Sequence, residues 1–99
     1  MKKFDYSEGK IEADIQLKSG EMLRITAVYP TPAEMITLIK RENDREEGFM
    51  QKALIDVFGM KKVIDENQIT YLQVAQIYSW YFEKLREDIK NVPPGNAGK

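Results

Sequence analysis

Apolar and polar residues alternate along two neighbouring runs near the start of the chain. In the first run, residues 10–17, the apolar positions are Ile11, Ala13, Ile15 and Leu17. In the second run, residues 22–29, they are Leu23, Ile25, Ala27 and Tyr29. A period of two places all of these side chains on one face of a strand. The two runs therefore predict an antiparallel β-hairpin with one buried face.

The residues between the two runs decide how the strands pair. A two-residue loop would place Ile15 opposite Arg24 and mix the two faces of the hairpin. A three-residue loop, residues 18–20, places Ile15 opposite Leu23 and puts Gly20 at the left-handed position of a bulged turn, where glycine costs least. We therefore expect the three-residue loop. Because a lone hairpin is only marginally stable, helices should cover its apolar face.

The period changes after the second run, where a helix is expected to begin. Thr31 can serve as the N-cap, Pro32 suits the first helical position, and Glu34 completes a capping box. The helical period then predicts a buried face. Its expected members are Met35, Ile36 and Ile39, with Leu38 at the margin.

A second helical face follows a charged stretch. It is formed by Met50, Ala53, Leu54 and Val57. Gly59 is suited to the C-cap of this helix. Gly48 would separate it from the first helix, and a single long helix over residues 32–58 with a polar middle is the alternative. After a connector, Thr70 or Asn67 is expected to cap a last helix that runs to about Lys90.

The last helix carries four aromatic residues within a short segment. At ~100° per residue, most of its large apolar residues share one stripe. The expected stripe consists of Tyr71, Val74, Ala75, Tyr78, Tyr81, Phe82, Leu85 and Ile89. Trp80 lies on the opposite side, and Ile77 lies on a flank.

Two interpretations of Trp80 stay open. In one, the helix is sandwiched, and another helix covers Trp80 because tryptophan is highly buried on average. In the other, Trp80 and Ile77 form an exposed contact patch, since exposed apolar patches mark partner sites and tryptophan is enriched at them. We take Trp80, Ile77 and Tyr81 as the candidate residues for contact with a protein partner.

The length of 99 residues fits one domain. We predict an α+β fold in which the N-terminal antiparallel β-hairpin packs on about three α-helices. Residues 1–9 should form a flexible arm, residues 10–90 the domain, and residues 91–99 a disordered tail, because Pro93 and Pro94 cannot continue a helix.

Composition narrows the function. The 15 basic and 16 acidic residues nearly cancel, which disfavours nucleic-acid binding. The chain contains no histidine and no cysteine, so the commonest general base, thiol nucleophiles and the usual zinc ligands are missing. We expect no enzyme, no metal site and no cofactor. No apolar run approaches the ~20 residues of a membrane span, so a cytoplasmic protein without membrane contact is expected.

The order of these segments along the chain is similar to that of a known protein family. A strand pair is followed by "RITAVYPTPAEMITLIKR", a middle helix and "DENQITYLQVAQIYSWYFEKL". Over residues 10–90 this layout resembles the bacteriophage tail assembly chaperones. The resemblance implies a non-catalytic phage or prophage protein, made in the bacterial host cell, that binds and solubilises the tape measure protein and aids polymerisation of tail tube subunits.

The resemblance supplies no catalytic motif. The alternative is a small regulatory protein-binding module, such as a transcription partner or a toxin-neutralising partner. Self-association into a homo-oligomer is compatible with both hypotheses.

Overall fold

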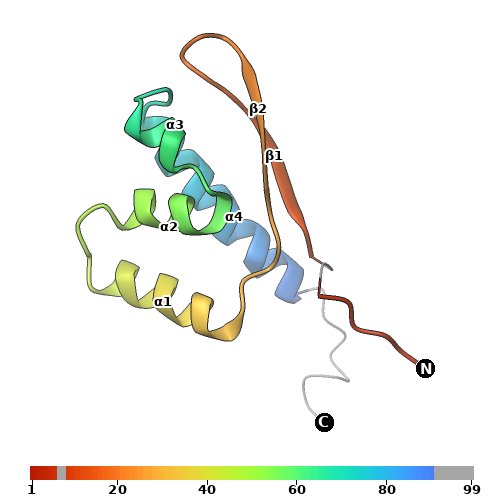
Figure 1. Cartoon of the computed structure of the whole chain (residues 1–99). Coiled ribbons are helices and arrows are strands. Elements are labelled where there is room, and N and C mark those ends of the chain that lie inside the picture. The colour runs from red at the N-terminus through yellow and green to blue at the C-terminus, as the bar shows by residue number, and fades with distance from the viewer. Residues whose placement is uncertain (7–8, 91–99) are drawn as a thin grey trace.

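The computed structural model describes residues 1–6 and 9–90, and within them the chain forms a hairpin followed by helices (Figure 1). The strands are β1 (Ile11–Gln16) and β2 (Met22–Ala27), and the helices are α1 (Pro32–Asn43), α2 (Phe49–Phe58), α3 (Lys61–Asp65) and α4 (Tyr71–Lys90). The predicted α+β fold is confirmed. The tail predicted at residues 91–99 lies outside the described residues.

The hairpin has the register that the alternation predicted. Ile15 pairs with Leu23 and Ala13 pairs with Ile25, so apolar residues face one another across the strands. The Leu17 N–H donates to the Glu21 carbonyl at 2.8 Å, which leaves a loop of residues 18–20. Gly20 has φ +94°, a left-handed conformation that side chains rarely adopt. The three-residue loop is therefore confirmed.

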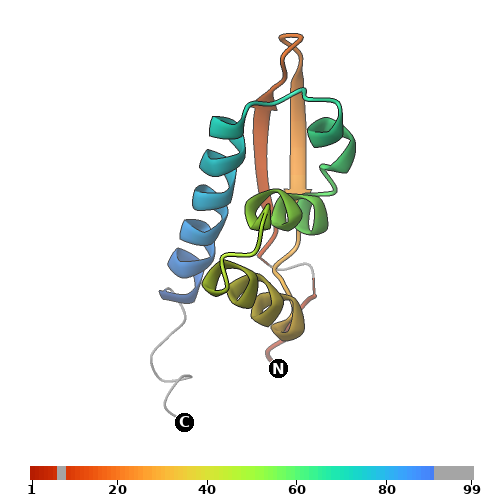
Figure 2. The ribbon, with the colours of Figure 1, turned by 90° about the vertical axis from the view of Figure 1, so that its left-hand side faces the viewer.

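The helices form a second layer on one side of the hairpin (Figure 1). In Figure 2, α4 runs beside β1, α2 lies in front of the strands, and α1 lies at the end of the hairpin opposite the turn. The interior between the layers is apolar, as burial of the alternating strand face requires. Its buried residues are Ile11, Ile15, Ile25, Leu38, Ala53, Leu54, Met60, Val74, Ile77, Tyr78, Tyr81 and Leu85.

Two hydrogen bonds fasten the turn end of the hairpin to the start of α4. The Lys18 N–H donates to the Gln68 carbonyl at 2.7 Å. The Gln73 side-chain amide donates to the backbone carbonyl of Gln16, at the end of β1, at 2.8 Å. Gln73 also accepts from the Thr70 N–H at 2.9 Å and donates its own N–H to the Thr70 hydroxyl at 3.1 Å. Thr70 is therefore the N-cap, one of the two residues expected for it.

The helix boundaries follow the predicted capping residues. The Thr31 N–H donates to the Glu34 carboxylate at 2.8 Å, and the Glu34 N–H donates to the Thr31 hydroxyl at 3.3 Å. This is the predicted capping box. Gly48 and Gly59 adopt left-handed conformations at the two ends of α2, so α1 and α2 are separate helices. Among the described residues, none of the helices has the length and apolar character needed to cross a membrane.

The buried face of α1 differs from the prediction. Leu38, expected at the margin, is 4% exposed, whereas Ile36 and Ile39 are 67% and 44% exposed. The apolar arc of this helix is wide, and α1 packs against the domain over only one end of that arc. The prediction for Ile36 and Ile39 is wrong because periodicity gives the arc but not the part of it that a neighbour covers.

Candidate protein-docking site

The three predicted contact residues all lie on α4, and two of them belong to the core. Tyr81 is 1% exposed and Ile77 is 8% exposed, so neither forms part of an exposed apolar patch. Trp80 is half-buried, and the Phe58 ring of α2 stacks on it with 6.4 Å between centroids. The predicted exposed patch of Trp80 and Ile77 is therefore wrong, and the interpretation in which a helix covers Trp80 lies closer to the structure.

The physical reason is a rotation of the buried stripe. The predicted stripe was centred on Tyr71, which is 65% exposed in the structure. Helix α2 packs along α4, and the hairpin is hydrogen-bonded to the same helix through Gln73 and Leu85. The buried face is therefore shifted towards Ile77 and away from Leu72, which is also 65% exposed. The helical wheel placed Val74, Tyr78, Tyr81 and Leu85 correctly, but it misplaced Tyr71 and Ile77 because it does not show where the neighbouring elements pack.

The exposed apolar side chains of the domain gather at other places. On α1, Ile36 and Ile39 form a pair that we call the α1 patch. A second pair, Tyr71 and Leu72, lies in the first turn of α4. Monomeric proteins expose single apolar residues routinely, but adjacent ones on a helix that packs on its other side are typical of contact surfaces.

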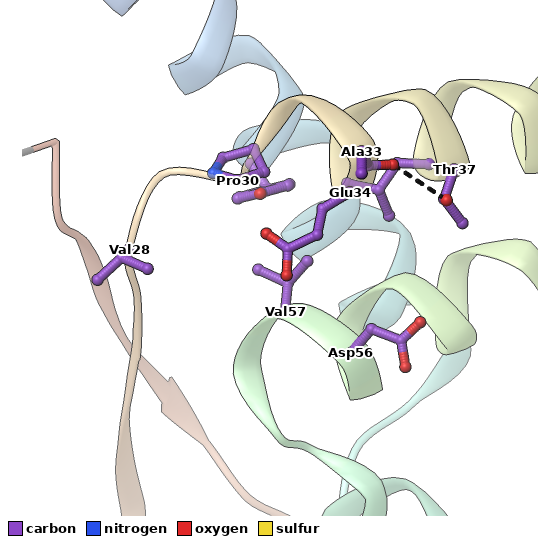
Figure 3. A pocket seen from close by; sticks show the side chains of 9 residues that line it. Val28, Pro30, Ala33, Glu34, Thr37, Asp56 and Val57 are labelled. Atoms are coloured by element: carbon purple, nitrogen blue, oxygen red, sulfur yellow. Dashed lines mark hydrogen bonds between the residues drawn. The ribbon is translucent and has the colours of Figure 1, made fainter. Parts of the chain in front are cut away.

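A pocket of about 450 Å³ opens beside α1, between the segment that leaves β2 and helices α1 and α2 (Figure 3). This volume lies within the range of ordinary ligand-binding pockets. The lining residues are Val28, Pro30, Ala33, Glu34, Thr37, Leu38, Asp56, Val57 and Tyr81. Apolar groups form most of the walls, and two carboxylates stand among them.

The two carboxylates are each held by one hydrogen bond. Glu34 Oε1 accepts from the Thr31 N–H at 2.8 Å, and Asp56 Oδ2 accepts from the Arg41 guanidinium at 2.8 Å. Within the described residues, the second oxygen of each carboxylate has no hydrogen-bond donor. No lysine or arginine is among the lining residues, but the Arg41 guanidinium neutralises Asp56. Within the described residues, Glu34 is the lining carboxylate without an ion-pair partner.

Tyr81 closes the inner side of the pocket. Its hydroxyl is buried and, within the described part of the chain, has no hydrogen-bond partner. Burial, together with the nearby charges of Glu34 and the Tyr29 phenol, raises the pKa of Tyr81 to about 12. The phenol is therefore neutral at physiological pH. The pocket thus combines mostly apolar walls with two carboxylates and a buried phenol.

A second hollow of about 560 Å³ lies on the other side of the helix layer, between the end of α1 and α4. The Tyr78 hydroxyl donates to Glu42 there at 2.5 Å. Burial, and then the bond to this carboxylate, raises the pKa of Tyr78. Both acidic and basic side chains line this hollow, so it favours neither a cationic nor an anionic partner.

Of the pocket-lining residues, sequence reasoning singled out Tyr81 alone as a candidate contact residue. One signal was present: Val28 is apolar at a position where the alternation of β2 requires a polar residue, and it is 39% exposed. The pocket itself depends on how α1 and α2 pack, which no periodicity reveals. Comparison of the chain with protein-family models, with curated proteins and with solved structures gives no match.

Proposed function

We propose that this protein is a non-catalytic tail assembly chaperone of a phage or prophage. In this proposal it acts in the cytoplasm of the bacterial host, binds the tape measure protein, keeps it soluble, and aids polymerisation of tail tube subunits around it. The support from sequence is the resemblance over residues 10–90. The support from structure is the α1 patch, because a chaperone of this kind needs exposed apolar surface that a partner can cover.

The α1 patch is the observation that carries the proposal. Ile36 and Ile39 are spaced as i and i+3, so they form a short apolar ridge on a helix that is anchored by its capping box and by Leu38. Such a ridge can pack into the apolar face of a partner helix. Trp80, whose ring is partly accessible on α4, is a secondary candidate for the same partner.

Co-expression with a phage tape measure protein tests the proposal. We expect the full chain to raise the soluble fraction of that protein and to co-purify with it. The double variant Ile36→Ser/Ile39→Ser should lose both effects. The control is Tyr71→Ser/Leu72→Ser, which removes two apolar side chains of α4 that are each 65% exposed.

The proposal fails if the unmodified chain neither solubilises the tape measure protein nor co-purifies with it. If both double variants solubilise and co-purify with the tape measure protein to the same extent, the α1 patch is not the binding surface. Association with a transcription regulator or a toxin instead would support the regulatory-module hypothesis. Circular dichroism of both double variants, recorded beforehand, shows whether each is folded.

A further inference from the structure

We propose that the pocket beside α1 is a binding site for a small, uncharged and mainly apolar molecule, whose carbonyl or hydroxyl oxygen accepts a hydrogen bond from the Tyr81 hydroxyl. This inference goes beyond the proposed function and does not depend on it. It rests on one buried donor without a partner, on the contacts that already occupy the other polar groups of the wall, and on the apolar surface around them.

The Tyr81 hydroxyl is the polar group of the pocket that the fold leaves unused. Tyr81 is 1% exposed, and within residues 1–6 and 9–90 its hydroxyl has no hydrogen-bond partner. Buried hydroxyls are almost always bonded, because taking one out of water without a new partner costs free energy. A molecule in the pocket that supplies an acceptor to this hydroxyl would recover that cost.

The ring that carries this hydroxyl is held in place by its neighbours. Phe58 of α2 and Phe82 of α4 both pack edge-on against Tyr81, each with 5.4 Å between ring centroids. The donor is therefore fixed before any ligand arrives, and little conformational freedom is lost when a ligand binds to it.

The other polar groups of the wall are already engaged. Thr37 is the other lining residue with a side-chain donor, and its hydroxyl donates to the Ala33 carbonyl at 3.1 Å. Asp56 is paired with the Arg41 guanidinium at 2.8 Å. Among the described side chains that line the pocket, the Tyr81 hydroxyl is therefore the donor that is left for a ligand.

The surroundings of this donor favour an uncharged ligand. Burial, and then the negative charge of Glu34, raise the pKa of Tyr81, so the field of this carboxylate reaches the hydroxyl and disfavours an anion beside it. An ammonium group carries three donors, and beside Tyr81 it would find one oxygen among apolar walls. A carbonyl or hydroxyl oxygen needs only the one donor that Tyr81 supplies.

The rest of the pocket favours a compact apolar body. Val28, Pro30, Leu38 and Val57 supply apolar wall, and the volume of about 450 Å³ lies in the range of small-molecule sites. The pocket opens beside α1, between this helix, α2 and the segment after β2 (Figure 3). A single-ring aromatic ketone has the size and the one neutral acceptor that this arrangement requires.

An NMR titration of the full chain with acetophenone tests the site. Cumene and benzoate are of similar size, but cumene lacks the oxygen and benzoate carries a charge. We expect saturable shifts of the backbone amides of Ala33, Thr37 and Val57, with acetophenone bound more tightly than cumene and benzoate not bound. Saturable binding of benzoate at the same amides, or equal affinities for acetophenone and cumene, overturns the proposal.

Two tyrosine variants identify the donor. Tyr81→Phe should raise the Kd of acetophenone about tenfold, as for the loss of one neutral hydrogen bond, and should leave the Kd of cumene unchanged. Tyr78→Phe removes a phenol hydroxyl of the same helix that lies outside the pocket, so both Kd values should stay as they are. An unchanged Kd of acetophenone in Tyr81→Phe overturns the proposal, because the hydroxyl then contributes nothing to binding.

A third variant identifies the pocket. Ala33→Leu adds bulk to the wall and should weaken the binding of acetophenone and cumene alike. If the amide shifts persist unchanged in this variant, or if acetophenone gives no saturable shifts in the unmodified chain, the pocket is not a ligand site. These measurements use no tape measure protein, so their failure leaves the proposed function untouched.

Discussion

The Tyr78 hydroxyl and the Glu42 carboxylate join α4 to the end of α1, with 2.5 Å between the two oxygens. The two residues are 36 positions apart, and Phe49, at the start of α2, packs edge-on against the same Tyr78 ring at 5.5 Å. One side chain of α4 thus contacts both helices that flank the charged connection between α1 and α2. This relationship fixes where α1 ends relative to the core.

Tyr78→Phe should therefore destabilise the domain by about 1–2 kcal/mol, because it removes a hydrogen bond to a charged group while keeping the ring. Urea unfolding followed by circular dichroism measures the change. Glu42→Gln tests the same contact from α1, and the double variant should show a positive coupling between the two sites. Fully additive effects would show that the contact adds nothing to stability.

Stability should fall at alkaline pH. The pKa of Tyr81 is raised to about 12, and the pKa values of Tyr29 and Tyr78 are also raised, in each case chiefly by burial. Unfolded tyrosines ionise near pH 10, so above that pH the unfolded chain releases protons that the folded chain retains. The contribution of these phenols is complete below pH 10 and declines as pH rises above it, with that of Tyr81 lost as pH passes through about 12.

Urea midpoints measured between pH 8 and pH 11.5 check this expectation. Tyr81→Phe should flatten the alkaline decline, because one of the ionising groups is then missing in both states. A midpoint that stays constant up to pH 11 would contradict the burial of these three hydroxyls.

The orientation of α1 gives a third prediction. Leu38→Ala removes a side chain that is 4% exposed and should cost about 2–4 kcal/mol. Ile36→Ala, on the same helix but 67% exposed, should stay within about 0.5 kcal/mol. The pair is matched in size and location, and thermal or urea unfolding compares them directly. The reverse order would mean that α1 packs by its other side.

Trp80 is the subject of a fourth prediction. Since its ring is half-buried and stacked on Phe58, Trp80→Ala should cost about 1–3 kcal/mol, less than the 3–5 kcal/mol typical of a fully buried tryptophan. Trp80 is the only tryptophan, so its fluorescence reports on this contact alone. Phe58→Leu should shift the emission to longer wavelength, and an unchanged spectrum would argue against the stacking.

Local chemistry explains what the sequence could predict. The alternation of Ile15 and Leu23 with polar neighbours determines the register, because a shift by one residue would expose the whole apolar face. Thr31, Pro32 and Glu34 act within one turn of chain and need no other segment to form the cap. The hairpin and the start of α1 therefore followed directly from residues close together in sequence.

What the sequence could not predict depends on contacts between distant elements. Ile77 and Ile36 both lie at edges of apolar arcs, yet Ile77 is buried and Ile36 is exposed because of where neighbouring helices pack. The residues that line the pocket beside α1 come from the segment after β2 and from α1, α2 and α4. One of them, Tyr81, lies far along the sequence from the others. A helical wheel contains no information on that packing.

The Tyr29 hydroxyl donates to the Leu85 carbonyl at 2.9 Å, across 56 positions of sequence. This bond and the cover of α4 over β1 cannot form until the last helix has been synthesised. At about 5–20 residues per second, translation takes roughly 3–13 seconds from the end of β2 to the end of α4, and the apolar face of the hairpin lacks that helix during this time. During synthesis on the ribosome, the strands are therefore made before the helix that buries their apolar face. In this interval the exposed apolar face makes the nascent chain most prone to misassociation.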